Sequence, residues 1–319
     1  MKHLWRHITA ALLIGGPLLT DSHAGLLDQV IQQATPSSAS PHNAPPPANT
    51  QGGGLIDGLG GALGVDPKKL DLIKKGVQTV QAMQPIGEEA ERMLGESIGI
   101  EAFSRYGGLY RDEALTRYVN LVGRTVAEVT ERPGLEYRFA ILDSREENAF
   151  AAPGGYIFVT IGLLRSLKNE AELAGVLGHE LAHVNRKHML NTLQRSSVLS
   201  NISDLSMSAM NQDPKLLGAA IDQMNDLLFT HGIDKDLEFE ADRFGLEYAQ
   251  RAGYAPSGLQ AYLHRLARSQ GGATRSVFFT THPPVSDRLQ RVDGQLTRLP
   301  PVKGLALLEE RWKRHTAKL

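Results

Sequence analysis

The spacing of apolar positions along the chain predicts mostly helices. Residues 88–106 and 113–132 each carry apolar side chains three and four positions apart, which places them on one face of an α-helix. A helix is also expected to begin at Asp66, an N-cap candidate, with Pro67 at the first helical position. A Pro-Gly pair ends the helix over 113–132. The chain from about residue 66 to residue 132 is therefore expected to be largely helical.

The middle of the chain changes to the spacing of strands. Tyr137, Phe139 and Ile141 lie at every second position, which is the period of a β-strand. Residues 148–161 (NAFAAPGGYIFVTI) indicate a short segment, a Pro-Gly-Gly turn and a second β-rich strand. Helical spacing returns near residue 163 and continues to about residue 298. The pattern predicts an α+β fold, mainly helical, with a small sheet of about three or four strands.

The first 24 residues have the anatomy of a secretory signal peptide. A positive segment with Lys2 and Arg6 precedes a mostly apolar run, and Ser22, His23 and Ala24 form a small-x-small cleavage pattern. An uncleaved anchor is the alternative, but the run is shorter than the about 20 apolar residues that span a bilayer. We therefore expect an exported, periplasmic protein whose mature chain begins after residue 24.

The remaining sequence divides by composition. Residues 25–65 are rich in Pro, Ser, Ala and Gly and are expected to form a flexible linker. The folded domain is expected over residues 66–300, followed by a short helical tail at 301–319. With 34 Lys+Arg against 35 Asp+Glu, no nucleic-acid partner is expected. The chain has no cysteine, so any metal site must use His, Asp or Glu.

One short motif carries the metal chemistry. His179-Glu180-Leu181-Ala182-His183 is an H-E-x-x-H in an apolar segment, and residues four apart share one face of a helix. Two imidazoles one turn apart can bind one zinc ion, with Glu180 as general base. Two core histidines with other partners are the alternative. His188 lies about 140° round a continuous helix from His183, so we expect it to contact a neighbouring loop rather than the metal.

The third ligand must come from another segment. Residues 234–249 are expected to be helical, with Glu238 and Asp242 on one face beside Ala241 and Gly245. The small residues allow close approach to the histidine helix, so Glu238 is the candidate ligand. Asp242 is expected to hydrogen-bond a ligand histidine or to donate a proton. A solvated acidic helix face is the alternative.

Four motifs in order resemble one family. The H-E-L-A-H motif is followed by E-F-E-A-D-R, and the segments N-A-F-A-A-P-G-G and T-H-P-P lie before and after them. Together, over about residues 85–298, they resemble the gluzincin peptidases of metallopeptidase family forty-eight. That family includes CAAX prenyl proteases, HtpX-like membrane proteases and BepA-type exported peptidases. Only about twenty residues follow the T-H-P-P helix, so a form without a C-terminal repeat domain is expected.

The resemblance implies a zincin-like domain with its sheet beside the H-E-x-x-H helix. It implies His179, His183 and Glu238 as the ligands of one Zn²⁺ per subunit and Glu180 as the catalytic base. Asp242 is implied as the outer or proton-donating carboxylate. The T-H-P-P segment implies two further residues near the cleft, His282 and Arg288. There His282 would stabilise the oxyanion or block the metal, whereas a loop histidine and a surface arginine are the alternatives.

Two further segments are expected to border the cleft. Gly154 and Gly155 permit turn geometries closed to other residues, and the strand that starts at Tyr156 is expected to lie beside the metal. An edge strand there would pair with an extended peptide, and Asn148 is a candidate for orienting it. An ordinary hairpin is the alternative. Residues 196–230, with Met207, Met210 and Met224, are expected to pack in the core or to cover the cleft as a lid.

These features predict an exported zinc endopeptidase. By the resemblance, its substrates are polypeptides, chiefly misfolded proteins of the cell envelope, and an association with the outer membrane or with another membrane surface is left open. No pattern in the sequence assigns an oligomeric state. The competing hypothesis is a chaperone-like or assembly factor whose protease site is blocked by His282 or by residues 196–230.

Overall fold

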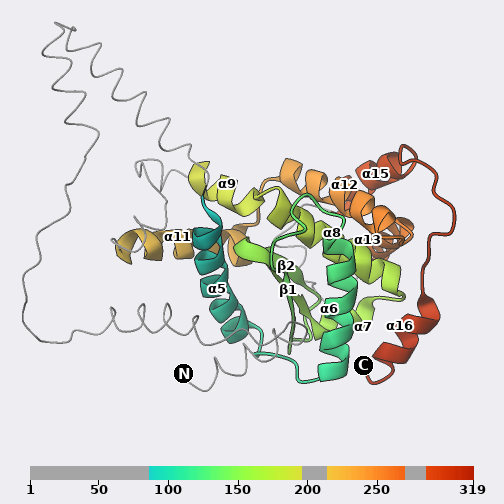
Figure 1. The fold of residues 1–319 in the computed structure, drawn as a ribbon, viewed down its shortest axis with the longest axis horizontal. Helices are drawn as coiled ribbons and strands as arrows, with labels where there is room; N and C mark the ends of the chain where they lie inside the picture. Colours follow the sequence, from blue (N-terminus) through green and yellow to red (C-terminus); the bar gives the residue numbers. More distant parts are fainter. Residues whose placement is uncertain (1–85, 196–213, 270–284) are drawn as a thin grey trace, which may run out of the picture. The chain divides into compact units, whose positions relative to one another are not determined.

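The structure, a computed structural model, describes residues 86–195, 214–269 and 285–319 (Figure 1). The expected signal peptide, the linker and the helix at Asp66 lie outside these residues, as do Met207, Met210 and His282. The helices are α5 (Glu88–Arg105), α6 (Glu113–Ala127), α7 (Ile161–Ser166), α8 (Glu170–Asn185), α9 (His188–Arg195), α11 (Pro214–Asp226), α12 (Lys235–Arg251), α13 (Ser257–Ser269), α15 (Val285–Leu296) and α16 (Glu309–Thr316). The strands are β1 (Arg138–Leu142), β2 (Ala149–Ala152) and β3 (Tyr156–Thr160). A 3-10 turn (Pro153–Gly155) and a π-helical turn (Leu227–His231) complete the described elements.

The mainly helical α+β class is confirmed, but the order of the strands differs from the expectation. The described sheet has the order β1-β3-β2, with β3 parallel to β1 and antiparallel to β2. The strand that starts at Tyr156 is therefore central, and β2 forms the edge. The short Pro-Gly-Gly turn folds β3 back beside β2, and β1 pairs with the other side of β3. The outer side of β2 is therefore left without a partner strand in the described sheet.

The two glycines of that turn lie close to the backbone of two neighbouring segments. Gly154 has φ +74° and Gly155 has φ +91°, a region that side chains with a Cβ rarely adopt. A Cβ at Gly154 would lie 2.7 Å from the Cα of Arg92 in α5, and one at Gly155 would lie 2.7 Å from the carbonyl oxygen of Glu136. These two glycines thus allow the turn to pack against α5 and against the segment before β1.

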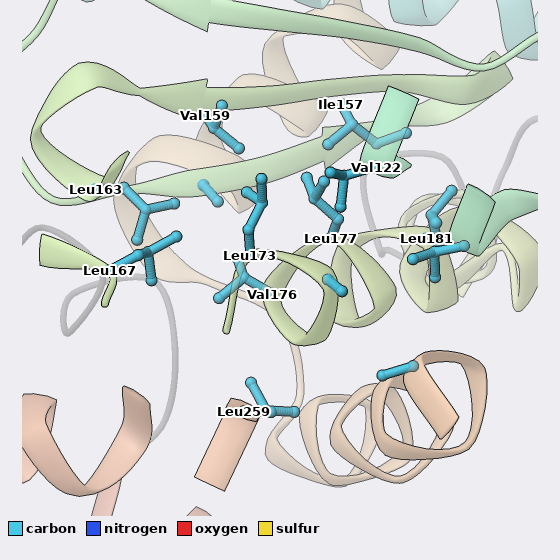
Figure 2. Close-up of a cluster of buried hydrophobic side chains, with 14 of the residues drawn as sticks. Val122, Ile157, Val159, Leu163, Leu167, Leu173, Val176, Leu177, Leu181 and Leu259 are labelled. Carbon is cyan, nitrogen blue, oxygen red and sulfur yellow. The ribbon is translucent and has the colours of Figure 1, made fainter. Parts of the chain in front are cut away.

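Helix α8 is buried along its whole length. Asn169 caps it by accepting a hydrogen bond from the Glu172 amide, at 2.9 Å. Leu173 and Leu177 point toward Ile157 and other apolar side chains of the sheet side, whereas Leu259 of α13 lies on the opposite side of the helix (Figure 2). The helix also contacts α6 and α12. Because neighbouring elements pack against several sides of it, the helix holds the side chains of its H-E-x-x-H motif in fixed positions.

The C-terminal helix α16 packs onto α6 (Figure 1). Trp312 is buried and donates a hydrogen bond to the Leu167 carbonyl, at 3.2 Å. Arg311 pairs with Glu170, a buried carboxylate in the first turn of α8 that also accepts hydrogen bonds from Tyr118 and Tyr254. Residues of the segment 301–319 thus anchor the start of the histidine helix.

The two helices that carry the candidate ligands touch through glycine. A Cβ at Gly178 of α8 would lie 3.0 Å from the Gly245 carbonyl oxygen, and a Cβ at Gly245 of α12 would lie 2.9 Å from the His179 amide nitrogen. Both distances are to backbone atoms, which cannot move without shifting a helix. The close approach expected from Gly245 is therefore present, and it sets the distance between the histidines and Glu238.

Gly245→Ala is expected to destabilise the fold by about 1–3 kcal/mol, the usual cost of overpacking. The added methyl group has no space, and the loss should exceed the gain in helix propensity. Urea unfolding of the full chain measures the change. Gly294→Ala on α15 is the matched control, since nothing lies within 4 Å of its new Cβ, and it should stabilise the protein by about 0.5–1 kcal/mol. Equal stability of Gly245→Ala and the wild type would show that the contact is not tight.

Candidate metal centre

Three side chains from α8 and α12 converge on one point. The Nε2 atoms of His179 and His183 lie 3.1 Å apart. Glu238 places Oε2 at 3.4 Å from Nε2 of His179 and Oε1 at 3.5 Å from Nε2 of His183. His179 and Glu238 are almost fully buried, and His183 is 9% exposed. The three residues predicted as metal ligands thus lie together in the structure, close enough to bind one ion.

The distances between these atoms fit a tetrahedral metal ion. Zinc binds histidine nitrogen and carboxylate oxygen at about 2.0–2.2 Å, so two ligand atoms on one tetrahedral ion lie about 3.3–3.5 Å apart. The observed 3.1–3.5 Å separations are close to this range. Two imidazole nitrogens and one carboxylate, with a fourth position left for water or substrate, are also the donor set of a catalytic zinc site. The residues therefore fit a zinc ion.

Asp242 and Arg288 lie behind His179. Asp242 accepts a hydrogen bond from Nδ1 of His179, at 3.0 Å, so Nε2 of that ring is directed toward His183 and Glu238, where a metal would bind. Arg288 donates two hydrogen bonds to the same carboxylate, Nε to Oδ2 at 2.9 Å and Nη2 to Oδ1 at 2.6 Å. Asp242 and Arg288 have no exposed surface. The arginine expected near the cleft thus lies on the far side of His179 and acts through Asp242.

The charges around His179 favour a cation at its ring. Burial and the Arg288 charge lower the pKa of His179, but the hydrogen bonds to Asp242 and Glu238 outweigh them and raise that pKa to about 9. Burial opposes ionisation of Asp242, yet Arg288 and His179 hold the pKa of that carboxyl below its ordinary value. Asp242 is therefore an ionised acceptor. Of the two roles expected for it, its surroundings favour the hydrogen bond to His179 over proton donation.

His183 has a different partner, which the sequence did not indicate. Nδ1 of His188 lies 3.0 Å from Nδ1 of His183, and Nε2 of His188 lies 3.4 Å from Oε2 of Glu240. The expected loop contact of His188 is thus replaced by a contact with the candidate ligand itself. The prediction from helical angles is wrong because α8 ends at Asn185 and Lys187 has φ +54°, so His188 begins a new helix. Burial lowers the pKa of His188, which keeps its ring neutral near pH 7.

A pocket opens beside the three ligands. Its wall combines polar groups of the site with apolar side chains from β2, α8, α9 and the π-helical turn. It is lined by Glu91, Phe150, Ala151, Ala152, Pro153, Glu180, His183, Val184, Lys187, Met189, Leu190, Leu227, Leu228, Ile233 and Glu238. Glu180 thus faces the same space as two of the candidate ligands. A group at this position can exchange a proton with a molecule bound next to the metal.

The residues proposed to bind substrate lie elsewhere. Asn148 is buried and donates from Nδ2 to the Tyr106 hydroxyl, at 2.9 Å. The Tyr156 hydroxyl donates to Glu96, at 2.9 Å. Of the turn at 153–155, Pro153 belongs to the pocket lining, whereas Gly154 and Gly155 do not. Asn148, Gly154, Gly155 and Tyr156 therefore build the hairpin and its contact with α5. The edge of the sheet next to the pocket is made by the preceding residues, Phe150 to Ala152.

The segment considered as a lid is described only from residue 214 onward. Met224 is fully buried in a cluster with Leu216 and Ala220, which is the core packing expected for it. The π-helical turn that follows sends Leu227 and Leu228 into the pocket lining. This turn belongs to the segment expected to pack in the core or to cover the cleft. The pocket residues of α9 and of β2 were missed in the sequence, because their apolar spacing does not differ from that of ordinary core positions.

Within the described ranges, no helix combines the length and the apolar character that crossing a membrane requires.

Comparisons with known proteins agree with this geometry. The family model described as Peptidase family M48 matches residues 113–296. The beta-barrel assembly-enhancing protease of Escherichia coli (strain K12) is 28% identical over 205 residues, which is 61% of this chain and 41% of that protein. The mitochondrial metalloendopeptidase OMA1 of Schizosaccharomyces pombe is 27% identical over 213 residues, 65% of this chain and 61% of that protein. The metalloprotease YcaL of Escherichia coli (strain K12) is 28% identical over 163 residues, 51% of this chain and 63% of that protein.

The chain thus spans less than two thirds of the length of each of these relatives. The family match covers more than half of the chain and includes both helices that carry the ligand cluster. The match and the site therefore support the same assignment, and the chain belongs to Peptidase family M48, a family of zinc metallopeptidases.

Proposed function

We propose that this protein is an endopeptidase that holds one zinc ion per chain and cleaves extended polypeptide segments in the cell envelope. The observation that carries the proposal is the cluster of His179, His183 and Glu238, with ligand atoms 3.1–3.5 Å apart, next to Glu180 in one pocket. A bound zinc ion supplies Lewis acidity, which polarises a scissile carbonyl and lowers the pKa of water.

The chain's own groups perform the proton transfers. Glu180 takes the proton from the attacking water and delivers it to the leaving amine, since its carboxylate lines the pocket beside His183 and Glu238. Asp242 and Arg288 keep the His179 ring in one tautomer and one orientation. Asp242 stays ionised during this cycle because Arg288 holds its charge.

The position of β2 supports binding of the substrate as an extended strand. Thr160 donates its amide hydrogen to the Asn148 carbonyl, at 3.0 Å, and hydrogen-bonded pairs alternate along antiparallel strands. By this alternation, Phe150 and Ala152 pair with β3, and the backbone groups of Ala149 and Ala151 are directed toward the outer edge. An extended peptide can add to such an edge, and the pocket lining includes part of it.

The rest of the pocket favours an apolar side chain next to the scissile bond. Leu190, Leu227 and Leu228 contribute to its wall. The one carboxylate at its α5 side, Glu91, pairs with Lys187 and, at 3.0 Å, with Arg132, so its charge is already balanced. A charged substrate side chain would lose its hydration there without gaining a partner. Unfolded segments, which expose apolar residues, therefore fit better than folded surfaces.

The cellular setting rests on the sequence and on the names of the relatives. Residues 1–24 are expected to direct export to the periplasm. One relative is called a beta-barrel assembly-enhancing protease, and that name describes the relative. For this chain we propose a role in quality control of envelope proteins, with misfolded proteins as substrates. Contact with the outer membrane is part of the same proposal.

Zinc binding by wild type and by Glu238→Ala tests the proposed site. Wild type is expected to bind one zinc ion tightly. Removing a group that only hydrogen-bonds a metal ligand weakens binding by about 10–100-fold. Glu238→Ala removes a ligand itself, so its zinc affinity should fall by more than that. Chelator competition gives the dissociation constants, and digestion of casein gives the activity.

Glu247→Ala is the matched control, because Glu247 lies on the same helix, is 30% exposed in its side chain and pairs with Arg243 away from the ligands. It should keep both zinc and activity. Full, tight zinc binding by Glu238→Ala, or a wild type without zinc, would contradict the proposed site.

A further inference from the structure

The two ligand histidines are held from behind by different groups. Behind His179 lies a carboxylate with an arginine, whereas behind His183 lies a second imidazole, that of His188, with Glu240 beyond it. We propose that His188 is a positioning residue for the metal site: its ring accepts the Nδ1 hydrogen of His183 and so fixes Nε2 of His183 toward the metal. The inference rests on the proposed zinc site.

The tautomers follow from the ligand geometry. In the cluster, Nε2 of His183 faces His179 and Glu238, so the metal bond uses Nε2 and the ring hydrogen is on Nδ1. Nδ1 of His188 lies within hydrogen-bond distance of that Nδ1, at 3.0 Å, and accepts its hydrogen. His188 then carries its own hydrogen on Nε2, which points to Glu240 at 3.4 Å. One tautomer of each ring satisfies these contacts.

The surroundings hold this arrangement in place. His188 is 1% exposed, so its ring cannot exchange the contact for water without opening the structure. Glu240 is itself bonded to Arg186, at 2.9 Å, which keeps the carboxylate next to His188. The break between α8 and α9 at Lys187 is what turns His188 back toward His183, because on a continuous helix the ring would point away.

The chemistry of the two supports differs in a way that matters for the metal. A carboxylate raises the basicity of the histidine that donates to it, whereas a neutral imidazole orients its donor with a smaller change in charge. His179 therefore receives both orientation and negative charge from Asp242. His183 receives orientation from His188, and the charge of Glu240 is one ring further from the metal.

Three substitutions at two positions test the role of His188. His188→Ala is expected to weaken zinc binding by about 10–100-fold, the usual effect of losing an outer partner of a ligand. His188→Asn should weaken it by less than about tenfold, because the asparagine Oδ1 can accept a hydrogen bond near the place of Nδ1. Glu240→Ala should cause a measurable loss that is smaller than that of His188→Ala. Chelator competition gives the constants, and the absorption bands of bound Co²⁺ report the ligand geometry.

Leu193→Ala is the matched control for burial on the same helix. Leu193 is fully buried in α9 and belongs to an apolar cluster, so its loss should lower thermal stability and leave zinc affinity and the Co²⁺ bands unchanged. Glu240 is partly exposed, so Glu240→Ala reports on the same contact even if the buried His188→Ala does not fold.

The possible results separate this inference from the proposed function. Tight zinc binding by wild type together with unchanged affinity in His188→Ala overturns the role of His188 and leaves the zinc site intact. Equal losses in His188→Asn and His188→Ala also overturn it, since they point to ring volume rather than to the hydrogen bond. A wild type that binds no zinc overturns the proposed function itself, and the positioning role with it.

Discussion

Glu180→Gln is expected to lower kcat/KM for cleavage of an unfolded polypeptide by about 10²–10⁴-fold, the contribution of a general acid–base group. The amide has the shape of the carboxylate but cannot take a proton from water. Zinc stoichiometry should stay at the wild-type value, because the ligand cluster of His179, His183 and Glu238 does not include this residue. The measurement is turnover of a quenched fluorescent peptide with an apolar residue beside the scissile bond, at matched zinc occupancy.

The control for this substitution is Glu172→Gln on the same helix. Glu172 is buried in the first turn of α8 and pairs with Arg265. Glu172→Gln therefore removes a carboxylate charge from the same helix at a residue outside the candidate zinc ligands. It should lower thermal stability and leave kcat/KM of the folded protein close to wild type. Turnover by Glu180→Gln within tenfold of wild type would remove Glu180 from the role of base, even if zinc binding were normal.

Local patterns predicted the parts of the fold that depend on local chemistry. The three- and four-residue spacing gave α5 over Glu88–Arg105, and the two-residue spacing gave β1. The H-E-x-x-H spacing placed His179 and His183 together because one helical turn separates positions four apart. Glu238 followed from the need for a third ligand and from the family motif, and it lies in the same cluster.

Tertiary placement set the features that the sequence did not indicate. The edge position of β2 depends on which side of β3 it occupies, and neither strand carries a signal for that. The turn at Lys187 uses a positive φ at a residue that usually avoids it, so the link from His188 to His183 could not be read from helical angles. Arg288 was expected near the cleft, but α15 contacts α12 and carries it to Asp242.

Arg288→Met is expected to destabilise the protein by about 3–5 kcal/mol, the cost of leaving one member of a buried ion pair without the other. The Asp242 carboxylate would then lie fully buried without the Arg288 guanidinium, while the His179 ring still donates a hydrogen bond to it. In wild type, the pKa of Asp242 is lower in the folded protein than its ordinary value of about 4. The ionised carboxylate therefore stabilises the fold at pH values above about 4, and this stability is lost as the pH falls through the lower pKa of the folded state. Urea unfolding of the zinc-free chain measures the difference.

The pair Arg288→Met and Asp242→Leu, combined in one chain, separates the fold from the metal site. Replacing both charges with apolar groups should restore most of the stability, as for other buried ion pairs. Zinc affinity should nevertheless stay about 10–100-fold below wild type, because Nδ1 of His179 no longer has an acceptor. If the double variant binds zinc like wild type, Asp242 and Arg288 serve the packing of α12 and α15 alone. If it recovers stability but not affinity, the two residues position His179 for the metal.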